Sequence, residues 1–439
     1  MVGLFMRKII KLTFSLFIVI ALLISGCTEK QTDKPADDSN GDVVVIPALF
    51  RMDGETGIQP HKDLIELFNK TYEGRYRIDV EWFVGEESNY RERIRLLNAT
   101  DQLPALFTDV GVLPDFYRLL VENDRLVNIT PYLEADGEWA AKFPKHVIDS
   151  CTEEDGGMYL IPITTPEYLA GVFYNEKIFE KAGIEHFPTT WEEFFNACDA
   201  IKAQGYTPLG LHTTGTAWTT MLFATAWMGS SQDGRNFMKL QYPDSYDAPA
   251  MRDMLKTVSR LFDYGSEDSI DGDFDDAYRG FIDGNTAMFP NGQWMIAGLY
   301  DENLVRPETV EHIRFALFPG NTAVGSVQAS GWAIASQYPQ EVIEGAIKFV
   351  KLRTSVEQKY LRDGMEKIKQ KPLLFEFYTV IADTETVIPS YQIKWNSIIQ
   401  NEVFLIDLPQ YLQGEISVDE LIERMDQAVI RFNYERNVS

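Results

Sequence analysis

Cysteine is scarce in this chain of 439 residues, and the short motifs of common enzymes are missing. The three cysteines are Cys27, Cys151 and Cys198, and no two of them form a CxxC pair. The five histidines lack the spacing of a metal site, and no GxSxG, HExxH or Walker motif occurs. We therefore expect no metal ion, no cofactor and no enzyme of these classes.

The cysteines and the carboxylates each leave one question open. In an exported protein Cys151 and Cys198 are able to form a disulfide, although two separate thiols fit the sequence equally well. The 66 acidic residues also allow an enzyme that works with two carboxylates, because any pair of them can meet in the folded chain.

Basic residues are few, since 40 Lys and Arg stand against 66 Asp and Glu, a net charge of −26. A chain this acidic is repelled by the phosphates of nucleic acid and by anionic lipid. We therefore expect no nucleic acid among its partners and no body that lies flat on a membrane.

A long hydrophobic run is also missing. The main apolar stretch, residues 12–24, is 13 residues long, whereas the core of a bilayer needs about 20. Arg7, Lys8 and Lys11 come before it, and small residues come after it. This arrangement is typical of an export signal rather than of a membrane-spanning helix.

The end of this signal determines where the mature protein begins. The residues Ile-Ser-Gly-Cys at 24–27 resemble a bacterial lipobox, in which the cysteine receives a diacylglycerol and becomes the first residue. The resemblance predicts a signal peptide over 1–26, lipidation of Cys27 and a polar tether over 27–41. The protein would then be held on the extracytoplasmic face of the cell membrane by lipid alone. A plain secretory signal and an N-terminal anchor are the alternatives.

The remaining 413 residues are too many for one ordinary core, so we expect two lobes. The first part of the body alternates between strand-like and helix-like patterns, which predicts an α/β lobe with a largely parallel sheet. The expected strands are 43–50, 76–84 and 103–111, and the expected helices are 61–72 and 89–100.

Ligands of parallel sheets bind outside the carboxyl ends of the strands. The turns that follow the first and third expected strands are therefore candidate walls of a binding site. The first turn supplies Arg51, Asp53 and Glu55, and the second supplies Asp109.

Five later motifs resemble the family 1 extracellular solute-binding proteins of ABC importers, which include maltose- and oligosaccharide-binding proteins. The match begins near residue 42 and continues to the C-terminus. The motifs are YNEKIFEKAGI (174–184), PTTWEEF (188–194), GNTAMFPNGQW (284–294), AIKFVKLRTS (346–355) and LQGEISVDELIERMDQAVIRF (412–432). Within them, Thr190 and Glu193 have the spacing of a helix capping box.

The resemblance implies an α/β fold of two lobes, joined by a hinge around an interlobe ligand cleft. The N-lobe would hold 42–112 plus 322–358, and the C-lobe would hold 113–321 plus 359–439. It also implies a function: a monomeric receptor, without enzyme activity, captures a solute outside the membrane and delivers it to the permease subunits of an ABC importer. Mono- or oligosaccharides are the solutes that the resemblance favours.

The resemblance also suggests which side chains hold the solute. Aromatic rings stack on the C–H faces of a sugar, while acids and amides bind its hydroxyl groups. A core role is the alternative for each ring, and the core is where we place Trp191 and the other tryptophans. The predicted ligand-binding residues are Trp294, Trp218, Tyr168, Asp109, Trp332, Glu167, Arg51 and Glu55.

Two departures from the family pattern bear on the solute. Relatives often carry Pro-Asp where this chain has Pro104-Ala105, and where they often carry a short proline-containing loop the segment 363–374 of this chain is charged and different. The alternatives are therefore a receptor of the same fold for a polyamine, a phosphorylated polyol or a metal complex, and a surface glycosidase.

Overall fold

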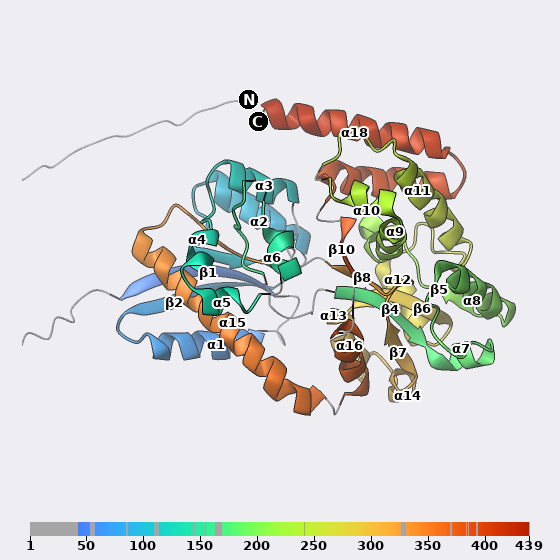
Figure 1. The fold of residues 1–439 in the computed structure, drawn as a ribbon, viewed down its shortest axis with the longest axis horizontal. Helices are drawn as coiled ribbons and strands as arrows, with labels where there is room; N and C mark the ends of the chain where they lie inside the picture. Colours follow the sequence, from blue (N-terminus) through green and yellow to red (C-terminus); the bar gives the residue numbers. More distant parts are fainter. Residues whose placement is uncertain are drawn as a thin grey trace, which may run out of the picture. The chain divides into compact units, whose positions relative to one another are not determined.

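Two β-sheets, each with helices packed around it, make up the computed structural model (Figure 1). The predicted signal peptide, Cys27 and the predicted tether lie outside the described residues. The described residues begin at 43, where the first strand is expected to begin. The structure describes residues 43–52, 58–84, 87–108, 114–143, 145–153, 155–162, 169–240, 242–325, 331–368, 371–382, 384, 386–391 and 394–438.

The first sheet has the strand order β2-β1-β3-β9. Its strands are β1 (Val44–Met52), β2 (Tyr76–Val84), β3 (Leu106–Thr108) and β9 (Trp332–Ile334). The strands β2 and β3 pair with β1 in parallel, and β9 pairs with β3 in the antiparallel sense. The largely parallel sheet that the alternating pattern predicts is thus present, and β2 has the predicted bounds.

Helices cover both faces of this sheet because both faces of β1 are apolar. On one face Ile46 and Phe50 pack beneath α1 (Ile58–Thr71) and α15 (Gln340–Ile368). On the other face Leu49 packs against α2 (Glu87–Ala99) and α3 (Pro114–Glu122). Strands buried on both faces are expected for a parallel sheet.

The second sheet has the strand order β10-β8-β4-β6-β5, and β7 also pairs with β4. Both faces of its central strand are buried. The strands are β4 (Leu169–Asn175), β5 (Thr207–Leu209), β6 (Thr286–Gly292), β7 (Ile313–Ala316), β8 (Thr322–Gly325) and β10 (Thr386–Pro389).

One helix of the second lobe begins as the sequence predicts. Helix α8 (Trp191–Ala203) begins with the predicted capping box, in which Thr190 and Glu193 bond to each other's backbone. The others are α7 (Glu176–Lys181), α9 (Trp218–Ser230), α10 (Gln232–Met238), α11 (Pro249–Phe262), α12 (Phe274–Ile282), α13 (Trp294–Leu299), α14 (Pro307–Val310), α16 (Pro372–Ala382), a π-helix (Ile399–Asp407), α17 (Leu408–Leu412) and α18 (Val418–Val438).

The packing groups the helices that follow β3 with the first sheet. We expect the second lobe to begin at 113, but α3 and the short helices α4 (Thr130–Glu134), α5 (Gly137–Ala140) and α6 (Lys145–Cys151) pack with the first sheet. Their apolar side chains complete its two cores. Conversely β8, assigned to the first lobe from the sequence, pairs with β4 and β10 of the second sheet.

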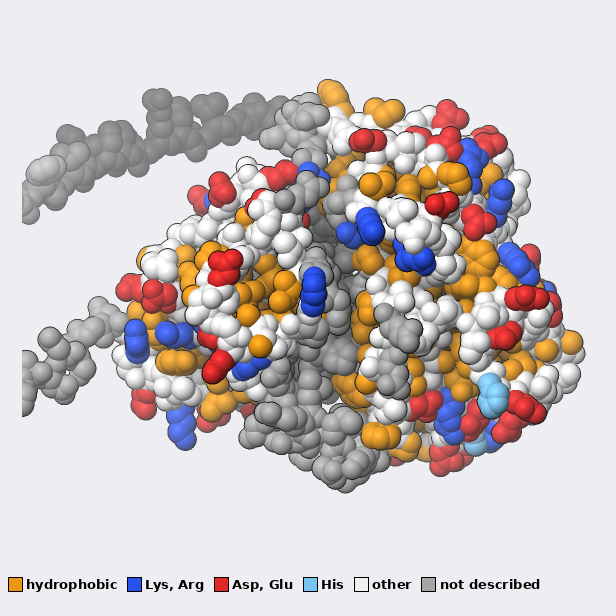
Figure 2. Space-filling view, viewed as in Figure 1, with side chains coloured by type: hydrophobic (Ala, Val, Ile, Leu, Met, Phe, Trp, Pro, Cys, Tyr) orange, Lys and Arg blue, Asp and Glu red, His pale blue; other side chains and the backbone are white. Residues whose placement is uncertain are grey.

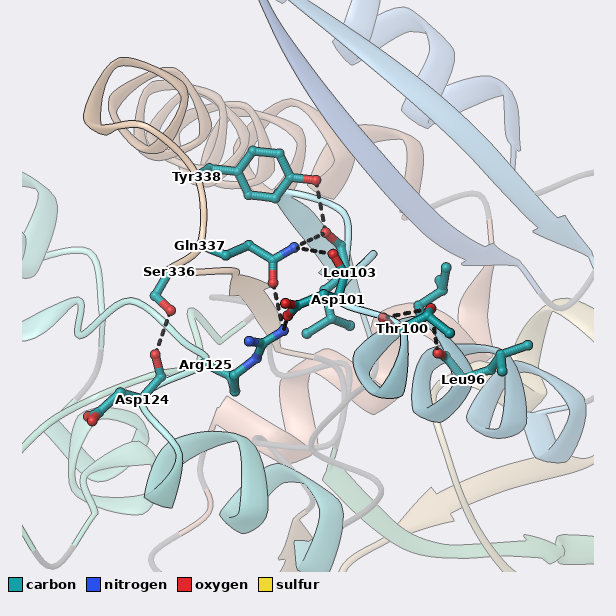
Figure 3. A network of polar contacts seen from close by, with 10 residues as sticks. Leu96, Thr100, Asp101, Leu103, Asp124, Arg125, Ser336, Gln337 and Tyr338 are labelled. Carbon is teal, nitrogen blue, oxygen red and sulfur yellow. Dashed lines mark hydrogen bonds and ion pairs between the residues drawn. The ribbon is translucent and has the colours of Figure 1, made fainter.

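A network of polar contacts explains why the segment after β3 stays with the first lobe (Figure 3). The guanidinium of Arg125 donates to Asp101 at 2.5 Å and to Gln337 at 2.8 Å. The amide of Gln337 and the hydroxyl of Tyr338 both donate to the carbonyl of Leu103. Three turns that are far apart in the sequence are thereby fastened together at the amino end of β3.

The two remaining cysteines do not form a disulfide. Cys151 and Cys198 are both buried, neither is in a disulfide, and they belong to different apolar cores. Burial raises the pKa of the Cys198 thiol well above its usual value, so this thiol is unreactive. In the described part of the chain, no helix is both long enough and apolar enough to span a bilayer.

Candidate functional site

A strained turn in the second lobe presents the predicted binding residue Trp218. The turn Gly215–Ala217 runs directly into α9, whose residues from 219 to 226 are all buried. Gly215 has a φ of 61°, Thr216 of 66° and Ala217 of 51°. A left-handed conformation costs a non-glycine residue about 1–2 kcal/mol. Such strain persists only where the surroundings hold it, and it is common at binding sites.

Hydrogen bonds from distant segments hold this turn. The hydroxyl of Tyr391 donates to the carbonyl of Thr216 at 2.6 Å. The backbone N–H and the hydroxyl of Thr214 both donate to the carbonyl of Gly272. Trp218 is therefore fixed on one side by the buried helix that it begins and on the other by a clamped turn.

The second predicted tryptophan, Trp294, is presented by the end of β6 and the start of α13. Every residue of β6 is buried, but the side chain of Trp294 is 42% exposed. Its indole lies directly over Gly292, where a Cβ atom would come within 2.2 Å of the ring. Only glycine at this position lets the ring lie against the strand.

Four aromatic side chains come together here, and we name them the open aromatic cluster: Trp218, Phe274, Tyr278 and Trp294. The ring of Trp218 stacks on Phe274 at 5.5 Å with an interplanar angle of 18°, and Phe274 stacks on Tyr278 at 5.7 Å and 12°. Trp294 lies 6.3 Å from Trp218 at a tilt of 44°. The structure thus brings two of the predicted binding residues together beside a stack of rings.

A buried histidine, His212, packs against two rings of this cluster. The ring of His212 is fully buried and makes edge contacts with Trp218 and Phe274. Burial lowers the pKa of His212 to about 4, so the ring is neutral near pH 7. Its Nδ1 lies 2.9 Å from the carbonyl of Thr214 and must carry the hydrogen, because a carbonyl only accepts.

Carboxylates flank the cluster at the start of α12. Asp273 caps this helix by accepting a bond from the backbone N–H of Asp276. Asp275 and Asp276 are exposed in the first turn. The surroundings therefore offer acceptors for hydroxyl or ammonium groups.

Two further predicted residues lie at the carboxyl edge of the first sheet, as the strand order predicts. The backbone N–H of Arg51 donates to the Thr108 hydroxyl at 3.2 Å, and Thr108 pairs with Trp332 across β3 and β9. The indole of Trp332, however, is only 1% exposed. The Trp332 ring therefore has no face open to a solute.

Trp332 belongs to a second group of rings, which we name the closed aromatic cluster: Phe50, His61, Trp82 and Trp332. Phe50 lies 4.6 Å from Trp332 at 76° and 5.7 Å from Trp82 at 84°. The guanidinium of Arg353 covers Trp332 at 4.2 Å from the ring centre. Burial, followed by the positive charge of Arg353, lowers the pKa of His61 to about 4.

The other predicted site residues, Tyr168, Glu167, Asp109 and Glu55, lie outside the described residues. Conversely, sequence reasoning missed Phe274, Tyr278 and Tyr391. The spacing of Phe274 and Tyr278, four apart on one helix, was a usable signal. Nothing local marks Tyr391, because its partner is 175 residues away. Among the described side chains, no three His, Cys, Asp or Glu residues converge on a metal site.

Comparisons with solved structures bear on the fold. A chitin oligosaccharide-binding protein superposes with a TM-score of 0.69 at 17% identity, covering 89% of this chain and 99% of that one. The sugar-binding protein MalE of Xanthomonas citri gives a TM-score of 0.68 at 16% identity, covering 90% and 100%. These similarities establish the two-lobed α/β fold of the periplasmic binding proteins.

Comparisons of sequence bear on the family. The sn-glycerol-3-phosphate-binding protein UgpB of Brucella abortus is 29% identical over 117 residues, which is 24% of this chain. The match spans about a quarter of that relative, 27% of its length. The family model of the bacterial extracellular solute-binding proteins matches residues 56–360. The chain therefore belongs to the bacterial extracellular solute-binding proteins.

Proposed function

We propose that this protein is the carbohydrate receptor of a bacterial ABC importer. The observation that carries this proposal is the open aromatic cluster, in which the exposed Trp294 stands beside the clamped Trp218. Flat aromatic faces bind the C–H face of a sugar ring, and the acids at the start of α12 are suited to its hydroxyl groups. The solute would enter the cleft between the lobes, and the loaded receptor would dock on the permease.

The cellular setting is a second part of the proposal. We propose that Cys27 carries a lipid that holds a monomeric receptor on the outer face of the cell membrane. The lipobox-like sequence before Cys27 supports this. Metabolic labelling with a fatty acid should mark the full chain but not its Cys27→Ser variant. An unlabelled wild-type chain that leaves the cell would contradict the lipid anchor.

A second candidate solute is sn-glycerol 3-phosphate, which the matched relative in Brucella abortus binds according to its name. The exposed charged residues in the first turn of α12 are acids, which favours the sugar, and the last turn of the same helix carries one exposed cation, Arg279. A phosphate is normally held by Arg, Lys or helix N-termini.

A thermal-shift screen of residues 28–439 against mono- and oligosaccharides, polyamines and glycerol phosphates tests the proposal. A solute at 100 times its Kd stabilises the fold by about 2.7 kcal/mol and raises the melting temperature by a few degrees. We expect a shift with one series of sugars and no hydrolysis of that sugar. A shift in melting temperature with amines or phosphates alone would overturn the proposal that the solute is a sugar. Hydrolysis of the sugar would favour a glycosidase.

A further inference from the structure

Tyr391 is far from the open aromatic cluster in the sequence, yet it bonds to the turn that presents Trp218. Its side chain is fully buried in the second lobe, among Trp395 and Phe404. Its hydroxyl donates a hydrogen bond to the carbonyl of Thr216 at 2.6 Å. Buried tyrosine hydroxyls usually find a hydrogen-bond partner, and here the partner belongs to the strained turn.

The segment that carries Tyr391 is itself well supported. The strand β10 ends just before it, and the backbone N–H of Ser390 donates to Gly325 at the end of β8 at 2.8 Å. Further along, the backbone N–H of Ser397 donates to Asp115 of α3, in the first lobe, at 2.6 Å. The segment that carries Tyr391 is therefore hydrogen-bonded on both sides of this residue, at Ser390 and at Ser397.

The turn needs such a support because its conformation is unfavourable without one. Thr216 and Ala217 both adopt positive φ, which residues with a Cβ atom avoid. Released from its bond, the carbonyl of Thr216 is free to rotate, and a more relaxed turn would move the first residue of α9. That residue is Trp218, whose ring stacks on Phe274 and faces Trp294.

We infer that Tyr391 is a positioning residue for solute binding: by holding Thr216, it sets the orientation of Trp218 in the open aromatic cluster. This inference rests on the proposed function for its effect on affinity. Its effect on the orientation of the ring is independent of that function.

The substitution Tyr391→Phe removes the hydroxyl alone, and the same core supplies a matched control. Tyr246 is also fully buried and packs on Trp395, but its hydroxyl has no hydrogen-bond partner among the described residues. Tyr246→Phe therefore makes the same chemical change in the same core without touching the turn. The melting temperature of both variants shows that each is folded.

The first readout needs no solute. The eight tryptophans are replaced by 5-fluorotryptophan, and the ¹⁹F resonances of Trp218, Trp294 and Trp332 are assigned with Trp→Phe variants. We expect Y391F to shift or broaden the signals of Trp218 and Trp294 while that of Trp332 stays in place, and Y246F to change none of the three. Unchanged signals in Y391F would overturn the inference.

The second readout uses the sugar that gives the strongest thermal shift. We expect Y391F to raise its Kd about fivefold to tenfold, with Y246F near the wild-type value. In a Trp218→Ala background, Y391F should have no further effect, because its target is gone. An equal loss in both backgrounds would mean a general structural role and overturn the inference. If no sugar binds the wild type, the proposed function fails and the ¹⁹F spectra alone decide on Tyr391.

Discussion

The open and the closed aromatic cluster contain the same kinds of side chain but are packed in different ways. Each has Phe, Tyr or Trp rings from three elements, and a histidine whose pKa burial lowers to about 4 packs against these rings. In the closed cluster the rings of Phe50, Trp82 and Trp332 meet edge to face. In the open cluster the rings of Trp218 and Phe274 are nearly parallel. The clusters also differ in exposure, because Trp332 is 1% exposed whereas Trp294 is 42% exposed.

The backbone differs between the clusters as well. Trp332 lies within a sheet, where its neighbours on β3 and the helices α1 and α15 cover it. Trp218 follows two non-glycine residues with positive φ. The two clusters therefore share their residue types and differ in exposure and in backbone strain.

The largest expected effect is on the closed cluster. Trp332→Ala should lower the free energy of unfolding by about 3–5 kcal/mol, because it leaves a large cavity in the core of the first lobe. Denaturant unfolding measures the change. A loss below about 1 kcal/mol would mean that Trp332 is not the core residue described here.

The two histidines should make the fold sensitive to acid. In the unfolded chain a histidine binds a proton near pH 6.5, whereas in the fold His61 and His212 do so only near pH 4. The unfolded state thus binds more protons between these values, so stability is lost as the pH falls from about 6.5 to 4. Each histidine should account for up to about 3 kcal/mol.

Unfolding in urea at pH 7 and at pH 4.5 tests this, with His61→Gln and His212→Gln compared with the wild type. Each variant should lose less stability on acidification than the wild-type protein does. If either variant loses as much unfolding free energy between pH 7 and pH 4.5 as the wild type does, the histidine it replaces is not held neutral in the fold.

The open cluster should respond to Trp294→Ala in the opposite way to the closed one. Because the residue is 42% exposed, its removal should lower the free energy of unfolding by less than Trp332→Ala does, about 1–2 kcal/mol. The affinity for the sugar should fall about 10- to 100-fold, since a stacking face is lost. Calorimetric titration measures the affinity, and an unchanged Kd would remove Trp294 from the site.

The smallest expected effect concerns the cover of the closed cluster. Arg353→Leu removes the cation over Trp332 and should cost about 0.5–1 kcal/mol of stability. It should also raise the pKa of His61, because the charge of Arg353 helps to lower it. Arg353→Lys keeps the charge and should leave more of this shift in place. Proton NMR of the histidine rings distinguishes the two variants.

The sequence predicted local elements well and long-range packing poorly. The bounds of β2 and the capping box at Thr190 depend on nearby residues, and both are confirmed. The burial of Trp332 depends on α1 and α15, which lie at opposite ends of the first lobe's sequence. The sequence near Trp332 therefore did not predict this burial. For the same reason Tyr391 was missed, and the bounds of the two lobes stay a prediction. That a solute binds at Trp218 and Trp294 stays a prediction.

The order of strands along the chain has a consequence for folding. The first sheet is completed only by β9 (Trp332–Ile334), and the second only by β10 (Thr386–Pro389). Pairing residues so far apart is slow, because a long loop has to close before the contacts form. Neither sheet can be completed while the chain is still short. For a protein that is exported, this delay prolongs the time in which the polypeptide remains unfolded enough to be threaded through a membrane.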